Sequence, residues 1–287
     1  MVGCLLLCGA STKSVSLINT TDYNYTNKKL GSGELMAEEP RPRVRDKLAP
    51  ELGLPPPYRL VTLREAGDAF RHAQKIAAKE GAGTIVWVRR YDLVEFAVVL
   101  EPEEPLAAAR RTIYAGLCAV ADALATHAPP ETLISFEWPD AIFVQGGLVG
   151  GVQLAWPESE ETATPDWLVF GAMLRTAGLP AEEPGMRPNS AALEDEGFDD
   201  LGPGRLIGSF ARHFMVHIDA WQQEGFRRVM ESYLPRLPAD EHVERSIDGV
   251  GDLLVRKKGK AQVERRRLVP ALAPVSWFDP DTGSPRL

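Results

Sequence analysis

The pattern of hydrophobic positions predicts an alternation of strands and helices over most of the chain. Residues 63–80 place apolar side chains at helical spacing, which predicts an amphipathic helix that ends before Gly81. Runs rich in β-branched residues predict strands, because such side chains pack well on a pleated surface. The predicted strands are 84–88, 93–100, 134–137, 142–144, 152–156 and 167–170. A long amphipathic helix, 105–127, is expected between the second and the third of them.

The last third of the chain changes from helices to short strands. Helices are predicted over 205–224 and in a shorter segment that ends near Tyr233. The strands that follow are predicted at 243–247, 252–257 and 261–268. These elements predict an α+β fold, a mixed or antiparallel sheet packed with helices over 58–237. A small all-β, barrel-like domain with a disordered tail is expected over 238–287.

The N-terminal segment differs in composition from the rest. Residues 1–35 contain no Pro and no Arg, whereas all 23 Pro and all 23 Arg follow Met36. This break suggests that the true start is Met36. A lipoprotein signal around Cys8 is the rival interpretation, but it lacks the basic n-region that such signals carry. The Pro-rich stretch 37–57 cannot sustain a helix, so 1–57 is expected to be a disordered leader.

Composition and charge exclude several classes of function. The 287 residues are 44% hydrophobic and 25% charged, which is typical of a globular protein. A net charge of -8 argues against a nucleic-acid partner, and the lack of an apolar run of about 18 residues argues against a membrane span. Two of the three cysteines lie in the first eight residues, so no disulfide framework is expected. The composition favours a cytoplasmic protein.

The segment Glu137-Trp138-Pro139-Asp140, followed by a strand and by Gly150-Gly151-Val152, carries a resemblance. It is similar to the biotin protein ligase and lipoate protein ligase superfamily, whose biotin branch reads K-W-P-N-D, a strand, and K-L-A-G-I. Residues 220–225 resemble the family's closing helix, and 247–255 resemble a hairpin of its C-terminal barrel. The four segments occur in the family order and the resemblance extends over 58–268.

The resemblance implies a ligase that acts on an acyl cofactor. Its substrate would be biotin or lipoate/octanoate, ATP with Mg would activate the carboxylate, and a lysine of a carrier domain would accept the acyl group. Such chemistry needs N–H groups and cations around the phosphates, an apolar slot for the acyl chain, and a cation near the developing charge.

The sequence departs from the family at the three places that supply this chemistry. The cap before the first helix reads Ala66-Gly67-Asp68-Ala69, without the family's hydroxyl groups. The family's arginine-glycine loop is reduced to Arg89-Arg90-Tyr91-Asp92, and the family lysine is Leu148. No lysine occurs anywhere from 80 to 256, so no catalytic residue is assigned. The departures predict altered or reduced chemistry, such as transfer from an acyl donor that is already activated.

Three arginines are candidates to replace the missing cation. Arg89, Arg90 and Arg175 are permanently charged and bidentate toward phosphate or carboxylate, although Arg89 and Arg90 also fit a solvated hairpin. The other candidate binding residues are Trp138, Asp140, Gly150 and Gly151. Each has a second interpretation: Trp138 as core, Asp140 as a turn residue, and the glycines as a tight turn instead of a close approach to ligand.

Other chemical signals are weaker. His213 and His217 are spaced i, i+4 on a helix, but no third ligand accompanies them, so no metal site is predicted. Cys118 at apolar spacing is interpreted as a buried hydrophobe. The basic cluster 256–267 fits a solvated face or a docking surface for an acidic carrier domain. The leading hypothesis is a ligase-like acyltransferase; the alternative is a non-catalytic adaptor that binds cofactor or carrier domain.

Overall fold

The computed structural model describes residues 52–65, 67–178, 190–198 and 201–286. Its centre is a seven-stranded sheet in the order β1-β2-β3-β7-β6-β5-β4. The strands are β1 (Arg59–Leu63), β2 (Thr84–Arg89), β3 (Leu93–Leu100), β4 (Ile134–Glu137), β5 (Ala141–Val144), β6 (Gly147–Ala155) and β7 (Leu168–Arg175). β1 pairs with β2 in parallel and the other pairs are antiparallel, so the sheet is mixed. The predicted α+β class is confirmed.

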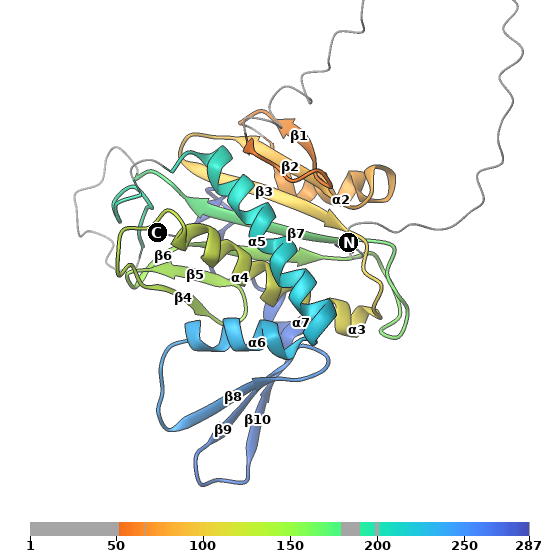
Figure 1. Ribbon diagram of the computed structural model, residues 1–287, viewed down its shortest axis with the longest axis vertical. Helices are drawn as coiled ribbons and strands as arrows, with labels where there is room; N and C mark the ends of the chain where they lie inside the picture. The colour runs from red at the N-terminus through yellow and green to blue at the C-terminus, as the bar shows by residue number, and fades with distance from the viewer. Residues whose placement is uncertain (1–51, 66, 179–189, 199–200, 287) are drawn as a thin grey trace, which may run out of the picture.

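Helices cover both faces of this sheet (Figure 1). On one face lie α4 (Thr112–Ala125) and α5 (Pro203–Glu224), whose Phe210 and Phe214 stack on Phe170 of β7. On the other face α2 (Ala69–Glu80) packs three alanines against the valines of β2 and β3. The short helices are α3 (Leu106–Ala109), α6 (Arg227–Tyr233) and the 3-10 turn η1 (Leu234–Arg236). None of the described helices has both the length and the apolar character that a membrane span requires.

The C-terminal part forms two further sheets. The strands β8 (Val243–Ile247), β9 (Leu253–Lys257) and β10 (Val263–Arg266) make an antiparallel sheet in the order β10-β9-β8, which projects away from the main sheet (Figure 1). The chain then forms α7 (Leu268–Leu272) and returns to the main sheet as the hairpin β11 (Phe278–Asp279) and β12 (Ser284–Pro285). β12 lies against β6 and β7. A disordered tail was expected within 238–287; in this structure residues 268–285 include α7 and this hairpin, and Trp277 is buried against the sheet.

Three boundaries also differ from the prediction. The helix predicted over 63–80 begins at Ala69, because 59–63 form β1 alongside β2. The helix predicted over 105–127 is divided into α3 and α4. Of the expected leader, 1–51 lie outside the described residues, whereas Leu52 is buried and the carbonyl of Gly53 accepts a hydrogen bond from Arg212 of α5.

Candidate functional site

A cavity of about 400 Å³ opens on the α2 side of the main sheet, between the N-terminus of α2 and the C-terminal segment. Strands β3, β7 and β6, which are neighbours in the sheet, contribute to it. Apolar and aromatic side chains with a few convergent polar groups are typical of small-molecule sites. We call it the sheet-face cavity. Its lining residues are Asp68, Phe70, Arg71, Gln74, Glu95, Phe96, Gln153, Gly171, Ala172, Met173, Val275, Trp277 and Phe278.

Two carboxylates of the chain occupy the N-terminus of α2. Asp68 caps the helix, and its side chain accepts a hydrogen bond from the N–H of Arg71 at 2.7 Å. Glu95 Oε1 accepts one from the N–H of Ala69, also at 2.7 Å. Helix N-termini often bind phosphate, but here internal acids have taken the donors. Among the described lining residues Arg71 is the one cation, and Asp68 lies 3.7 Å from it. This end of the cavity does not fit the phosphates of ATP.

Glu95 is a functional candidate that the sequence interpretation missed. It is 5% exposed, and burial raises the pKa of its carboxyl, an effect that the hydrogen bond from Ala69 opposes. The signal was present in the sequence: Glu95 is the one charged residue in the apolar strand 93–100. A carboxylate is costly to bury without partners, so Glu95 is a candidate for a role in ligand binding.

The C-terminal segment forms a wall of the cavity. Trp277 is 2% exposed, and its indole N–H donates to the carbonyl of Val152 in β6 at 3.2 Å. A Cβ atom added at Gly151 would lie 2.5 Å from the indole ring and 2.4 Å from the carbonyl oxygen of Asp140. Because Gly151 has no side chain, another group can lie directly against its backbone. In this structure that group is the indole of Trp277.

Asp140 lies behind this wall. The residue is 1% exposed, and the hydroxyl of Ser276 lies 3.4 Å from Oδ1. Among the described residues no hydrogen-bond partner is found for Oδ2. Burial raises the pKa of Asp140 to about 7, an effect that the hydrogen bond from Ser276 opposes. Asp140 contacts the C-terminal wall and is not among the lining residues of the cavity.

The three arginines predicted from the sequence lie outside the cavity lining. Arg90 forms a bidentate pair with Asp92, with distances of 3.1 and 2.8 Å, at the turn between β2 and β3. Arg89 is exposed at the end of β2. Arg175 is buried, and its Nη2 donates to the carbonyl of Pro285 at 2.6 Å, which fastens the C-terminal hairpin to β7. A role for these arginines toward phosphate or carboxylate stays a prediction.

Trp138 and Gly150 also lie outside the cavity lining. The indole N–H of Trp138 donates to the hydroxyl of Tyr114 at 3.0 Å, and that hydroxyl donates to the carbonyl of Gly251 at 2.6 Å. Trp138 thus belongs to a link between the β4–β5 turn, α4 and the β8–β9 turn. Gly150 has φ +152°, and an added Cβ would lie 2.0 Å from the carbonyl oxygen of Met173. Any larger residue at position 150 would clash with the backbone of β7, so the packing of the strands requires glycine here.

Leu148 stands where the resemblance places the family lysine. It is half-buried in β6, and its carbonyl accepts a hydrogen bond from the N–H of Ala191 at 3.0 Å. A leucine at this position supplies no charge to a developing anion.

A cluster of charged side chains links α4, α5 and η1. Asp122 of α4 accepts from His217 of α5 at 2.7 Å and from Arg236 of η1 at 2.5 Å. Burial raises the pKa of the nearby Cys118 thiol to about 12, which makes it a poor nucleophile. In the described part of the chain no group of three His, Cys, Asp or Glu residues is placed to hold a metal ion.

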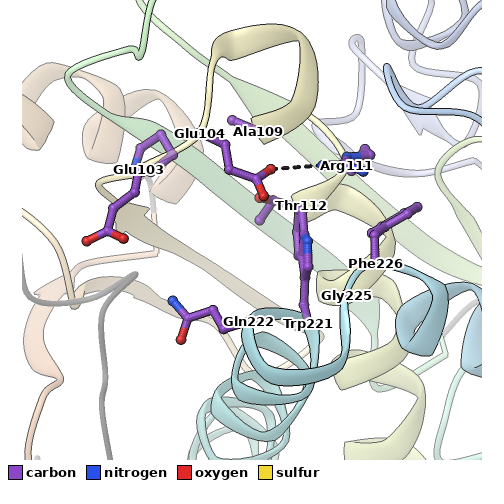
Figure 2. A pocket seen from close by; sticks show the side chains of 10 residues that line it. Glu103, Glu104, Ala109, Arg111, Thr112, Trp221, Gln222, Gly225 and Phe226 are labelled. Atoms are coloured by element: carbon purple, nitrogen blue, oxygen red, sulfur yellow. Dashed lines mark hydrogen bonds and ion pairs between the residues drawn. The ribbon is translucent and has the colours of Figure 1, made fainter.

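A second cavity, of about 550 Å³, lies between α3, the start of α4 and the end of α5. Figure 2 shows Glu104 directed at Arg111, with the two charged groups 2.9 Å apart. The guanidinium of Arg111 also lies over the rings of Trp221 and Phe226, at 5.1 and 4.6 Å from their centroids. This arginine is already paired. The cavity is larger than the sheet-face cavity, but α2 contributes no residue to its lining.

Comparisons with known proteins agree on one family. The model of the biotin/lipoate A/B protein ligase family matches residues 54–235. A biotin–[acetyl-CoA-carboxylase] ligase of Paracoccus denitrificans is 26% identical over 221 residues, which cover 69% of this chain and 88% of that protein.

Solved structures give the same result for the fold. A biotin protein ligase-like protein of unknown function from a Silicibacter species superposes with a TM-score of 0.66 and 25% identity, over 76% of this chain and 98% of that one. The apo biotin protein ligase of Aquifex aeolicus superposes with a TM-score of 0.58 and 14% identity, over 75% and 97%. The Aquifex protein has also been solved with biotin and ATP.

Proposed function

Because the chain belongs to the biotin/lipoate A/B protein ligase family, we propose that it attaches an acyl cofactor to a lysine of a carrier domain. The candidate cofactors are biotin, lipoate and octanoate. The observation that carries the proposal is the sheet-face cavity, whose apolar floor and volume of about 400 Å³ suit the acyl part of such a molecule. The proposal places this activity in the cytoplasm.

The proposal includes altered chemistry, in which the acyl group arrives already activated. Adenylation gathers negative charge that needs cations and free N–H groups. Asp68 and Glu95 take the N–H groups at α2, and Leu148 replaces the family lysine. With an activated donor, the acceptor amine attacks the acyl carbon, the bond to the leaving group breaks, and the amine releases a proton to solvent.

The test compares acyl donors on one acceptor. The purified chain is incubated with a carrier domain and either the free acid with ATP and Mg, or the preformed acyl-adenylate, or an acyl thioester. Intact mass then shows whether one lysine of the carrier domain is acylated above a reaction without the chain. We expect enzyme-dependent product from an activated donor and little or none from free acid with ATP. As much product from the free acid with ATP as from either activated donor would contradict the altered chemistry.

The second candidate is a non-catalytic adaptor that uses the same fold to bind cofactor or carrier domain. Leu148 favours it, because the position offers no group for the chemical step. Carrier binding without acylation from any donor would support the adaptor. The same incubation, followed by size-exclusion chromatography of chain and carrier domain, separates the two functions.

A further inference from the structure

Glu95 brings a strong hydrogen-bond acceptor into a cavity that is otherwise mostly apolar. It lies in β3 with its side chain on the α2 side of the sheet, and it lines the sheet-face cavity together with Phe70, Ala172 and Met173. Its neighbours along the strand, Val94 and Phe96, belong to the core on the opposite face. The alternation of the strand therefore places one carboxylate where an apolar residue is expected.

The carboxylate is only partly satisfied by the chain. An ionised carboxylate has about four acceptor sites. In the part of the chain that the structure describes, the Ala69 N–H is the one hydrogen bond found to it. The nearest acid, Asp68, is itself an acceptor, and Arg90 is committed to Asp92. A ligand in this cavity consequently meets an acceptor that needs a donor.

The free acceptor sites of Glu95 distinguish ligands that carry N–H donors from ligands that do not. A hydrocarbon chain or a disulfide ring has no N–H group, so its burial against Glu95 would leave the carboxylate without water and without a partner. A cyclic urea, by contrast, offers N–H donors to a carboxylate and a carbonyl acceptor for an amide. Gln153, on β6 across β7 from Glu95, lines the same cavity and carries such an amide.

We propose that Glu95 is a specificity-determining residue, which selects ligands whose head group carries N–H donors over plain acyl chains. The inference rests on the proposed function of the sheet-face cavity and narrows it to one ligand class. Gln153 contributes the complementary donor, and the ring lies on the sheet beside the Trp277 wall. A carboxylate at Glu95 also disfavours a second carboxylate in the cavity, so an uncharged ester is expected to bind better than the free acid.

The experiment measures binding of uncharged esters by isothermal titration calorimetry to the full chain. Biotin methyl ester carries a cyclic urea, and methyl octanoate has no N–H donor and the same ester group. Three proteins are compared: wild type, Glu95→Gln and Glu95→Leu. Glu137→Gln serves as the control, because Glu137 is an exposed strand carboxylate outside the cavity lining.

We expect wild type and Glu137→Gln to bind biotin methyl ester about 10- to 100-fold more tightly than methyl octanoate, the ratio that one or two hydrogen bonds to a charged group provide. Glu95→Leu should lose this preference and bind methyl octanoate more tightly than wild type does. Glu95→Gln keeps an acceptor for Ala69 and should give an intermediate ratio, so the test survives if the leucine variant fails to fold.

The outcomes are distinguishable. If both esters bind and their affinity ratio is the same in wild type and in both Glu95 variants, the role of Glu95 is overturned while the proposed function stands. If neither ester binds to any of the proteins, the cavity is not an acyl site, and the proposed function fails together with the inference.

Discussion

Replacing Asp140 by Asn removes the carboxyl group that lies buried behind the C-terminal wall of the cavity. Asn has nearly the same shape and cannot ionise. The pKa of Asp140 is raised from its ordinary value of 3.8 to about 7. The folded protein therefore holds this proton more tightly than the unfolded chain does. The stability that Asp140 contributes is fully present below about pH 4 and is lost as the pH rises to about 7.

The magnitude follows from the two pKa values. One pKa unit corresponds to about 1.4 kcal/mol, so a carboxyl with a pKa of about 7 in place of 3.8 costs about 4 kcal/mol once it is ionised. An unpaired buried amide in the Asn variant costs about 1–3 kcal/mol. Above about pH 7 the variant should therefore be more stable than wild type by about 1–3 kcal/mol, and this advantage should vanish or reverse near pH 4.

Urea unfolding followed by tryptophan fluorescence measures this difference. Between about pH 5 and about pH 8 wild type should lose about 3 kcal/mol of stability that Asp140→Asn retains. Asp166→Asn, at an exposed position, is the matched control and should follow wild type. If wild type and Asp140→Asn lost the same free energy of unfolding over this interval, the pKa of Asp140 would not be raised and the argument from its burial would be refuted.

Three further predictions concern packing and reactivity. Gly151→Ala should destabilise the fold by about 1–3 kcal/mol, because the new methyl group meets the Trp277 indole. In the Trp277→Ala background the same change should cost measurably less free energy of unfolding. If the two changes were additive in urea unfolding, this contact would be contradicted. Asp122→Asn should lower the free energy of unfolding by about 1–3 kcal/mol, because it weakens the contacts with His217 and Arg236; thermal melts measure it, and an unchanged melting temperature would argue against this link. Cys118 should resist iodoacetamide in the folded protein and react in urea, since burial raises the pKa of its thiol to about 12; rapid labelling of the native chain, followed by mass spectrometry, would show that the thiol is accessible.

The strands and the fold class were predictable because they depend on local patterns. Runs such as Leu93–Leu100 carry β-branched and apolar residues that suit buried strands, and their order is sufficient for the α+β class. β1 was missed because Arg59–Leu63 is short and its last residue also fits the helical pattern that follows. The parallel pairing with β2 decides its structure, and that pairing is a tertiary contact.

The site was less predictable, because it depends on contacts between distant segments. Trp277 bonds to Val152, which is 125 residues earlier, and no local pattern marks a tail residue as a cavity wall. The sequence predicted that Gly151 allows a ligand to come close or makes a tight turn, whereas the side chain that lies against it in the structure is Trp277. Glu95 could have been found, because a single charge in a buried strand is a local anomaly that usually has a function or a partner.

The central claim is that this chain transfers an activated acyl group to a carrier-domain lysine. The most direct test is the intact mass of a carrier domain after incubation with the chain and an acyl-adenylate, measured against the same mixture without the chain. The account predicts a single added acyl group, located by peptide mapping on one lysine, at a rate that depends on the concentration of the chain. An acylation level that is the same with and without the chain would contradict the claim.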